Sequence, residues 1–175
     1  TTEHYVEAPG GERQVAYFDK SRMEITDPDG DQDSVWFVTN GLLSTELITG
    51  QMQVGDVEFE TREPAEVNVA GDASDPDGPT YATFGSVLDA PPAEVGATIV
   101  QKIDREGNVT TVPELVERNV LAGPLDGVTN HSIAQPFWEF MTSSGTVWQD
   151  EAFVEDDLFE NPFYATGRPI TEAYW

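Results

Sequence analysis

The chain has 175 residues, of which 33 are acidic and eight are basic, so its formal net charge at pH 7 is −25. Such a chain repels nucleic acid phosphates and anionic lipid head groups, because binding to either begins with Lys and Arg displacing counterions. Cysteine is absent, which excludes disulfides and thiolate metal sites, and no apolar run approaches the roughly 20 residues of a membrane helix, so no membrane insertion is expected.

The N-terminal part of the sequence predicts an arm followed by strand. Residues 1–14 are polar and glycine-rich, which is typical of a flexible or assembly arm. Apolar and polar residues alternate in the next stretch, with Val15, Tyr17, Met23 and Ile25 as the apolar positions. A period of two predicts a strand that is half buried.

A strand, a helix and a hairpin are predicted next. The apolar run at residues 35–38 predicts a short buried strand. Leucines and isoleucines recur at helical spacing from Leu42, and Gly50 is expected to end that helix. Residues 51–61 have the pattern of two short strands around a glycine turn, which predicts a hairpin.

The second half predicts another hairpin and a second helix. Residues 99–112 contain two apolar strands around a turn. Ser132 is a candidate helix cap, although Pro136 allows the helix to begin at Gln135 instead. Residues 146–149 predict a short strand, and from there on the chain is expected to be irregular.

Many short strands and few helices predict a β-rich α+β fold, with short antiparallel strands, hairpins and two or three short helices. The predicted organisation is an arm at residues 1–14, a β-rich half at residues 15–89 and a second half at residues 90–175 that holds the aromatic helix and a Gly-Pro turn. One continuous domain is the alternative.

An aspartate-rich loop is the candidate metal site. Four carboxylates alternate within seven residues: Asp27, Asp29, Asp31 and Asp33. Ca²⁺ takes six to eight oxygen ligands, which closely spaced aspartates supply. The EF-hand spacing fails, because Gln32 stands where Gly is required and Val38 where Glu is required. The alternative is a solvated turn in which Asp is favoured for its hydrogen bonds to the local backbone.

Aromatic residues gather late in the chain. Amphipathic rings serve recognition when they are exposed, and packing in the core is the alternative. The candidates for contact with a partner or a sugar are Trp138, Trp148, Tyr164, Tyr174 and Trp175.

No motif identifies a catalytic centre, so no catalytic residue is assigned. His131 precedes Ser132, but sequence neighbours seldom form a nucleophile pair, and there is no Gly-x-Ser-x-Gly elbow. Glycoside hydrolysis needs two suitably spaced carboxylates. Glu139 and Glu172 are the candidates in aromatic surroundings, and we expect them to be structural or exposed.

Two segments carry a resemblance to a known group of proteins. Residues 15–24 (Val-Ala-Tyr-Phe-Asp-Lys-Ser-Arg-Met-Glu) are similar to an aromatic-basic strand of secreted surface proteins from Chloroflexota-type bacteria. Residues 137–140 (Phe-Trp-Glu-Phe) and residues 161–172 resemble the other half of that repeat-like module, in which an aromatic helix precedes a Gly-x-Pro turn. The pattern is distantly similar to the LGFP repeats of cell-wall proteins. The resemblance covers about a third of the chain, implies export and a non-catalytic role, and brings no catalytic residues with it.

The sequence therefore predicts a non-enzymatic extracellular or cell-surface module, structural or partner-binding, with calcium as the one candidate cofactor. Its first residue, Thr1, is typical of a processed, exported protein. The expected partners are other copies of the chain or a cell-surface polymer, and not nucleic acid. A self-assembling subunit of a filament or layer and a glycan-acting hydrolase are the alternatives.

Overall fold

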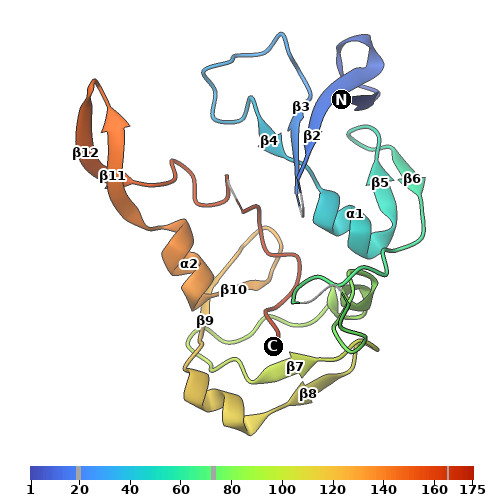
Figure 1. Ribbon diagram of the computed structural model, residues 1–175, viewed down its shortest axis with the longest axis vertical. Helices are drawn as coiled ribbons and strands as arrows, with labels where there is room; N and C mark the ends of the chain where they lie inside the picture. Colours follow the sequence, from blue (N-terminus) through green and yellow to red (C-terminus); the bar gives the residue numbers. More distant parts are fainter. Residues whose placement is uncertain (19–20, 72–73, 165) are drawn as a thin grey trace. The chain divides into compact units, whose positions relative to one another are not determined.

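The computed structural model of the protein describes residues 1–18, 21–71, 74–164 and 166–175. The chain divides into two compact units, Thr1–Gly85 and Ser86–Trp175, so the division falls close to the predicted boundary after residue 89. Short antiparallel sheets and short helices confirm the predicted β-rich α+β class (Figure 1). Among the helices of the described residues, none has the length and apolar character needed to cross a bilayer.

The first unit is built around a four-stranded antiparallel sheet in the order β1-β2-β3-β4. The strands are β1 (Thr2–His4), β2 (Glu12–Tyr17), β3 (Arg22–Ile25) and β4 (Thr39–Asn40), and η1 (Pro9–Gly11) joins the first two. The prediction of a flexible arm at residues 1–14 is wrong, because Thr2–His4 of β1 pairs with residues 12–14 of β2; the alternative, an assembly arm, stays a prediction. Ladder hydrogen bonds join main-chain groups and therefore form regardless of the polar side chains.

The helix and hairpin predicted for the first unit are confirmed. Helix α1 (Leu43–Thr49) ends at Gly50, whose φ of 71° is left-handed and whose N–H donates to the Glu46 carbonyl at 2.8 Å. Strands β5 (Gln51–Gln53) and β6 (Phe59–Thr61) then form the hairpin, and η2 (Ala82–Val87) begins at the end of this unit and ends in the next.

The strand predicted at residues 35–38 is wrong. This stretch consists of turns and bends that continue the aspartate-rich loop, since the Phe37 N–H donates to the Ser34 carbonyl at 3.0 Å. Trp36 is exposed there instead of buried, and the strand β4 begins only after the apolar run.

The second unit begins with the predicted hairpin of β7 (Gln101–Ile103) and β8 (Val109–Thr111). It continues through η3 (Pro113–Arg118), the strand pair β9 (Ala122–Leu125) and β10 (Ser132–Ala134), and helix α2 (Gln135–Met141). Ser132 is not the helix cap, because it lies in β10. The helix begins at Gln135, the alternative that the proline favoured.

A second hairpin follows α2: its first strand contains the short strand predicted at residues 146–149, and its second strand lies where an irregular chain is expected from the sequence. Strands β11 (Ser144–Gln149) and β12 (Ala152–Asp157) pair over six residue positions. Asp150 and Glu151 form the turn between them with φ of 50° and 62°. Two successive left-handed residues are typical of a type I′ hairpin turn, which usually contains glycine. Because this turn contains no glycine, the usual signal for a hairpin is missing from the residues.

The apolar core of the second unit is small. Its buried cluster consists of Ile99, Ala122 and Ala134, and three partly buried side chains pack against it: Ala93, Val120 and Ala173. Ala173 brings the C-terminal segment onto this cluster, so the end of the chain is part of the packing of the unit.

Candidate functional site

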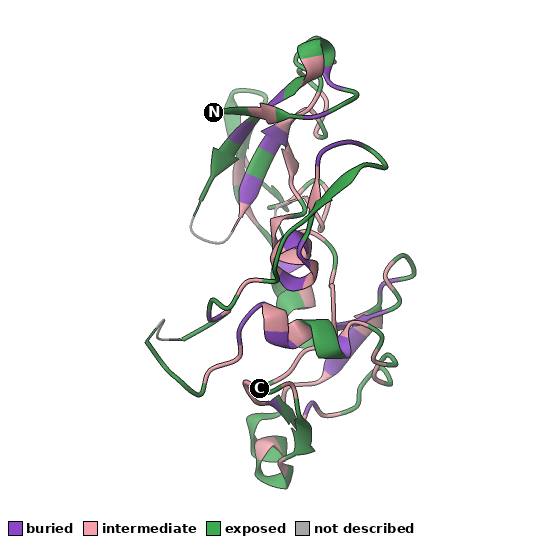
Figure 2. Ribbon diagram, turned by 90° about the vertical axis from the view of Figure 1, so that its right-hand side faces the viewer, coloured by how far each residue is buried: buried purple, intermediate pink, exposed green. Residues whose placement is uncertain are grey.

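The four-stranded sheet of the first unit buries a face that carries charges. Along β2 and β3, buried and exposed residues alternate, as Figure 2 shows. The buried positions include Arg13, Arg22 and Glu24, and Arg22 is only 1% exposed. Glu46 of α1 is also buried and meets them on this face. The single strand predicted at residues 15–25 forms parts of two strands, β2 and β3, and their buried face includes Arg22 and Glu24.

These four side chains form one chain of alternating charges. The Arg22 guanidinium donates from both terminal nitrogens to the two carboxylate oxygens of Glu46, at 2.7 and 2.8 Å, and from Nε to Glu24. Arg13 donates to the other oxygen of Glu24 at 2.9 Å and to the Gln53 carbonyl at 3.1 Å. Two positive and two negative charges thus compensate one another away from water, which a buried charge requires.

The electrostatics indicate that Arg22 stays charged and has a structural role. Burial by itself lowers the pKa of Arg22, but its hydrogen bonds to Glu46 and the charge of Glu24 outweigh burial and raise the pKa above its usual value. Beside the network, Arg13 lies 4.7 Å from the centre of the Tyr5 ring. Burial and the hydrogen bond to Asp56 raise the pKa of Tyr5 to about 12. Neither Arg22 nor Tyr5 is poised to exchange a proton near neutral pH.

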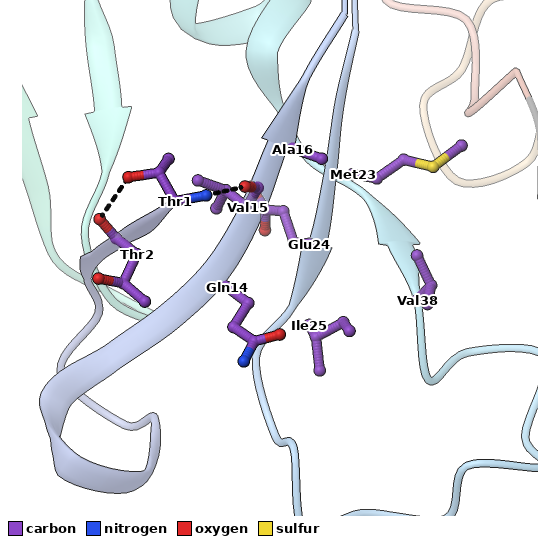
Figure 3. Close-up of a pocket in the computed structure, with 9 residues that line it drawn as sticks. All are labelled: Thr1, Thr2, Gln14, Val15, Ala16, Met23, Glu24, Ile25 and Val38. Atoms are coloured by element: carbon purple, nitrogen blue, oxygen red, sulfur yellow. Dashed lines mark hydrogen bonds between the residues drawn. The ribbon is translucent and has the colours of Figure 1, made fainter.

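The opposite face of the sheet is open and carries apolar side chains. A groove of about 690 Å³ lies on this face. The residues that line it, drawn as sticks in Figure 3, are Thr1, Thr2, Gln14, Val15, Ala16, Met23, Glu24, Ile25 and Val38. Val15 and Glu24 line the groove through their main chain, because their side chains are buried on the opposite, charged face of the sheet. Met23 is 40% exposed. The sheet is inverted, with arginine and glutamate side chains inside and Ala16, Met23 and Ile25 outside.

The aspartate-rich loop does not gather its four carboxylates. The Asp27 carboxylate accepts the Asp29 N–H at 3.1 Å, and Asp31 accepts the Asp33 N–H at 3.0 Å, as in Asx turns. A hollow of about 290 Å³ is lined by Asp27 and Asp31 but not by the other two. Within the described ranges, no group of three or more His, Asp or Glu side chains is placed to hold a metal ion. The calcium site stays a prediction.

In the second unit, Glu172 is buried and anchors the C-terminal segment. Its carboxylate accepts hydrogen bonds from the Ser132 hydroxyl, the Ser132 N–H at 2.8 Å and the Ala93 N–H at 3.0 Å, and it lies 3.2 Å from Nδ1 of His131. His131 and Ser132 therefore both contact the carboxylate. Ser132 is itself buried, so this constellation holds the fold and does not present a nucleophile. Glu139 is exposed on α2.

A second buried carboxylate holds the segment near Arg168. Burial alone raises the pKa of Asp126, but hydrogen bonds from Thr129 and Val128 and the charge of Arg168 outweigh it and hold the pKa below its usual value. Arg168 also lies 4.3 Å from the centre of the Phe163 ring, which in turn packs on Trp138 at 6.2 Å.

Four of the five predicted contact residues serve packing within the second unit. Trp138 and Tyr164 are half-buried, as is Tyr174. Burial and the charge of Glu172 raise the pKa of Tyr174. Trp175 is partly exposed, but its indole N–H donates to the Ile99 carbonyl at 2.7 Å, and its main-chain N–H and carbonyl both bond to β7.

The fifth, Trp148, lies in solvent on the β11–β12 hairpin, paired across the strands with Phe153. The two rings meet edge to face with centroids 4.9 Å apart, and the side chains are 63% and 75% exposed. Phe153 was missed because its strand was not predicted. The signal in the sequence is an aromatic residue on each side of a two-residue acidic turn, at the spacing that places both on one face.

The comparisons with known proteins give no further assignment. No family model, no curated protein and no solved structure matches this chain. The resemblance to surface-protein modules and LGFP repeats therefore stays a prediction from the residues that carry it, and the geometry above is the basis for any statement about function.

Proposed function

We propose that this chain is a non-enzymatic, partner-binding module of an extracellular or cell-surface protein. The observation that carries the proposal is the inverted sheet of the first unit. Charged side chains on the buried face hold the sheet to α1, while Met23, Ala16 and Ile25 on the outer face line an open groove. An exposed apolar surface of this kind marks an interaction site in soluble proteins.

The buried ionisable groups support binding over catalysis. A catalytic carboxylate must reach the substrate and exchange protons with it. Glu24, Glu46 and Glu172 are buried and accept several hydrogen bonds from the protein, and Asp126 is ionised against Arg168. These groups are committed to the fold, whereas the apolar groove and the exposed aromatic pair are open to a partner.

The charge supports an extracellular setting and limits the partners. Among the described residues, four acidic ones (Glu24, Glu46, Asp126 and Glu172) and two basic ones (Arg13 and Arg22) are buried, so most of the acidic excess of the sequence lies on the surface. Such a surface stays soluble in strong salt and repels polyanions. We infer that the partner is a neutral or basic protein segment or a neutral wall polymer.

An array of defined peptides and cell-wall polysaccharides, probed with the purified chain, tests this proposal. Binding without release of cleaved glycan is the expected result. Met23→Glu places a charge in the groove and is expected to weaken binding of a neutral groove ligand by at least about tenfold, since the desolvated charge has no partner there. Val57→Glu is the matched control, because Val57 is 82% exposed in the same unit and does not line the groove.

Two results would contradict the proposal. Cleavage of an array polysaccharide would establish the hydrolase alternative. Equal loss of binding in Met23→Glu and Val57→Glu would show that the groove is not the contact surface and that added negative charge alone accounts for the loss.

A self-assembling subunit is the second candidate, because the open edges of the β11–β12 hairpin can pair with another copy once salt screens the acidic residues that make identical hairpins repel each other. This hairpin is a two-stranded sheet, so each strand has one edge without a strand neighbour in the described residues. Open edges add strands from other chains. Sedimentation velocity at low and high salt decides: salt-dependent growth into regular assemblies supports the polymer, and a monomer in both conditions rules it out.

A further inference from the structure

We propose that the β11–β12 hairpin is the docking site for a cationic, extended segment of a partner protein. The inference deepens the proposed function and rests on it, since it names the chemistry of one partner. It combines three features of the hairpin: an exposed aromatic pair, carboxylates on the same face, and open strand edges.

The first feature is the ring pair. Trp148 and Phe153 face each other across the two strands and lie mostly in solvent. A Lys ammonium or an Arg guanidinium within about 6 Å of such a ring is attracted by its electron-rich face. The aliphatic stem of the same side chain packs on the ring, so one basic residue uses both properties.

The second feature is the charge beside the rings. Phe153, Glu155 and Asp157 lie two positions apart along β12, so their side chains are on the same face of the hairpin. Glu155 accepts the Thr146 hydroxyl at 2.6 Å, and Asp157 accepts the Ser144 hydroxyl at 3.2 Å. These cross-strand hydrogen bonds hold the carboxylates in place before a ligand arrives, which lowers the entropy lost on binding.

The third feature is the backbone. The hairpin extends away from α2 in Figure 1, and each of its strands has one edge that no other strand pairs with among the described residues. An extended peptide can add to such an edge through main-chain hydrogen bonds, with alternate side chains on the face of the rings. A basic residue at every second position would then meet Phe153, Glu155 and Asp157 in turn.

Charge complementarity selects this occupant over a second copy of the chain. Residues 144–160 hold six acidic residues and no basic one. Two such hairpins side by side would repel each other, and like charges at an edge are a known protection against pairing between identical strands. The same field attracts a cationic segment and raises its association rate at low salt.

Fluorescence anisotropy with a labelled twelve-residue peptide of alternating Lys and Thr tests the inference. Peptides with Gln or Glu in place of Lys are the comparison probes. The Lys peptide is expected to bind the purified chain most tightly and the Glu peptide not at all. Trp148→Ala is expected to weaken binding about fivefold, the loss of one exposed ring–cation contact.

A second variant, which removes charge only, distinguishes loss of binding from unfolding of the hairpin. Glu155→Gln with Asp157→Asn keeps the rings and the side-chain volumes, and it is expected to weaken binding about fivefold. Glu114→Gln with Glu117→Gln removes the same charge from exposed positions on η3 in the same unit. This control is expected to weaken binding by less than about twofold at 0.15 M salt, because distant charges are screened there.

Equal weakening in the two charge variants overturns the inference, because it would show diffuse attraction and no site. Equal affinity for the Lys and Gln peptides overturns the cationic class, and salt-independent dimers joined by the hairpin would show a second copy as the occupant. Amide NMR shifts on titration should concentrate in β11 and β12, and shifts elsewhere overturn the site. The proposed function fails separately, if no member of the peptide and polysaccharide array binds at all.

Discussion

Replacing Glu46 by Gln tests the buried charge network of the first unit. The glutamine side chain keeps nearly the same volume and can still accept the Gln53 N–H, which donates to Glu46 at 3.0 Å. It cannot neutralise Arg22, which loses both charged hydrogen bonds to α1. The buried part of the network would then hold two positive charges against the one negative charge of Glu24, since Glu3, 3.8 Å from Arg13, is partly exposed.

Removing one member of a buried ion pair costs about 3–5 kcal/mol, mostly through the charge left uncompensated. A unit of 85 residues has a stability of roughly 4–13 kcal/mol. Glu46→Gln is therefore expected to remove a large fraction of the stability of the first unit and to leave the second unit unchanged.

Hydrogen exchange followed by mass spectrometry measures each unit in the same sample. Peptides from β2 and β3 are expected to exchange at least about a hundredfold faster in the variant, and peptides from β9 and β10 serve as the internal control. Arg22→Met with Glu46→Leu removes both charges and is expected to restore most of the protection, because Arg13 and Glu24 still compensate each other. An increase of less than about tenfold for Glu46→Gln would show that Glu46 does not compensate a buried charge.

Three further predictions concern other parts of the chain. Asp150→Asn with Glu151→Gly replaces the two left-handed turn residues and should stabilise the β11–β12 hairpin by about 1 kcal/mol, measured by amide exchange in both strands; unchanged or weaker protection would contradict it. Asp126→Asn should destabilise the second unit by about 1–3 kcal/mol at pH 7. Because the folded-state pKa of Asp126 is lowered, the stability it contributes is present above about pH 4 and is lost as the pH falls through the folded pKa. The difference in unfolding free energy between variant and wild type, measured with urea, should therefore shrink toward pH 3, and a growing difference would contradict a lowered pKa. For the loop at residues 27–33, a calcium site predicts that Ca²⁺ raises the Tm more than Mg²⁺ does at equal concentration; equal rises with the two cations would favour the solvated turn, in which Asp27 and Asp31 each accept a backbone N–H.

Local turn chemistry explains which elements could be predicted from the sequence. The hairpins at residues 51–61 and 99–112 contain glycine turns, and Gly50 ends α1 at the predicted residue. The β11–β12 hairpin turns without glycine at Asp150 and Glu151, so the residue pattern did not indicate it. Residues 35–38 show the opposite error, because their apolar run predicts a strand whereas the structure has turns and bends there.

The inverted sheet could not be predicted from periodicity alone. A period of two shows that residues alternate between faces, but not which face is buried. Arg22 and Glu24 are inside because Glu46 and Arg13, which are distant in sequence, compensate their charges. Opposite charges two positions apart on a strand are the one local signal of this arrangement.

The exposed aromatic pair shows the same limit. The sequence indicates Trp148 as a contact residue because it belongs to the aromatic residues that gather late in the chain. Its partner Phe153 is identified only by the strand pairing. Cross-strand neighbours are set by the register of the hairpin, and a register cannot be assigned before the turn is recognised.

The inverted sheet is tested most directly by the solvent accessibility of two neighbouring side chains of β3 in solution. A neutral gadolinium chelate relaxes the NMR signals of groups that water can reach. The arrangement described above predicts strong relaxation of the Met23 methyl group and little effect on the Arg22 Nε–H signal, which is bonded to Glu24. Little relaxation of the Met23 methyl signal together with strong relaxation of the Arg22 Nε–H signal would contradict the inverted sheet.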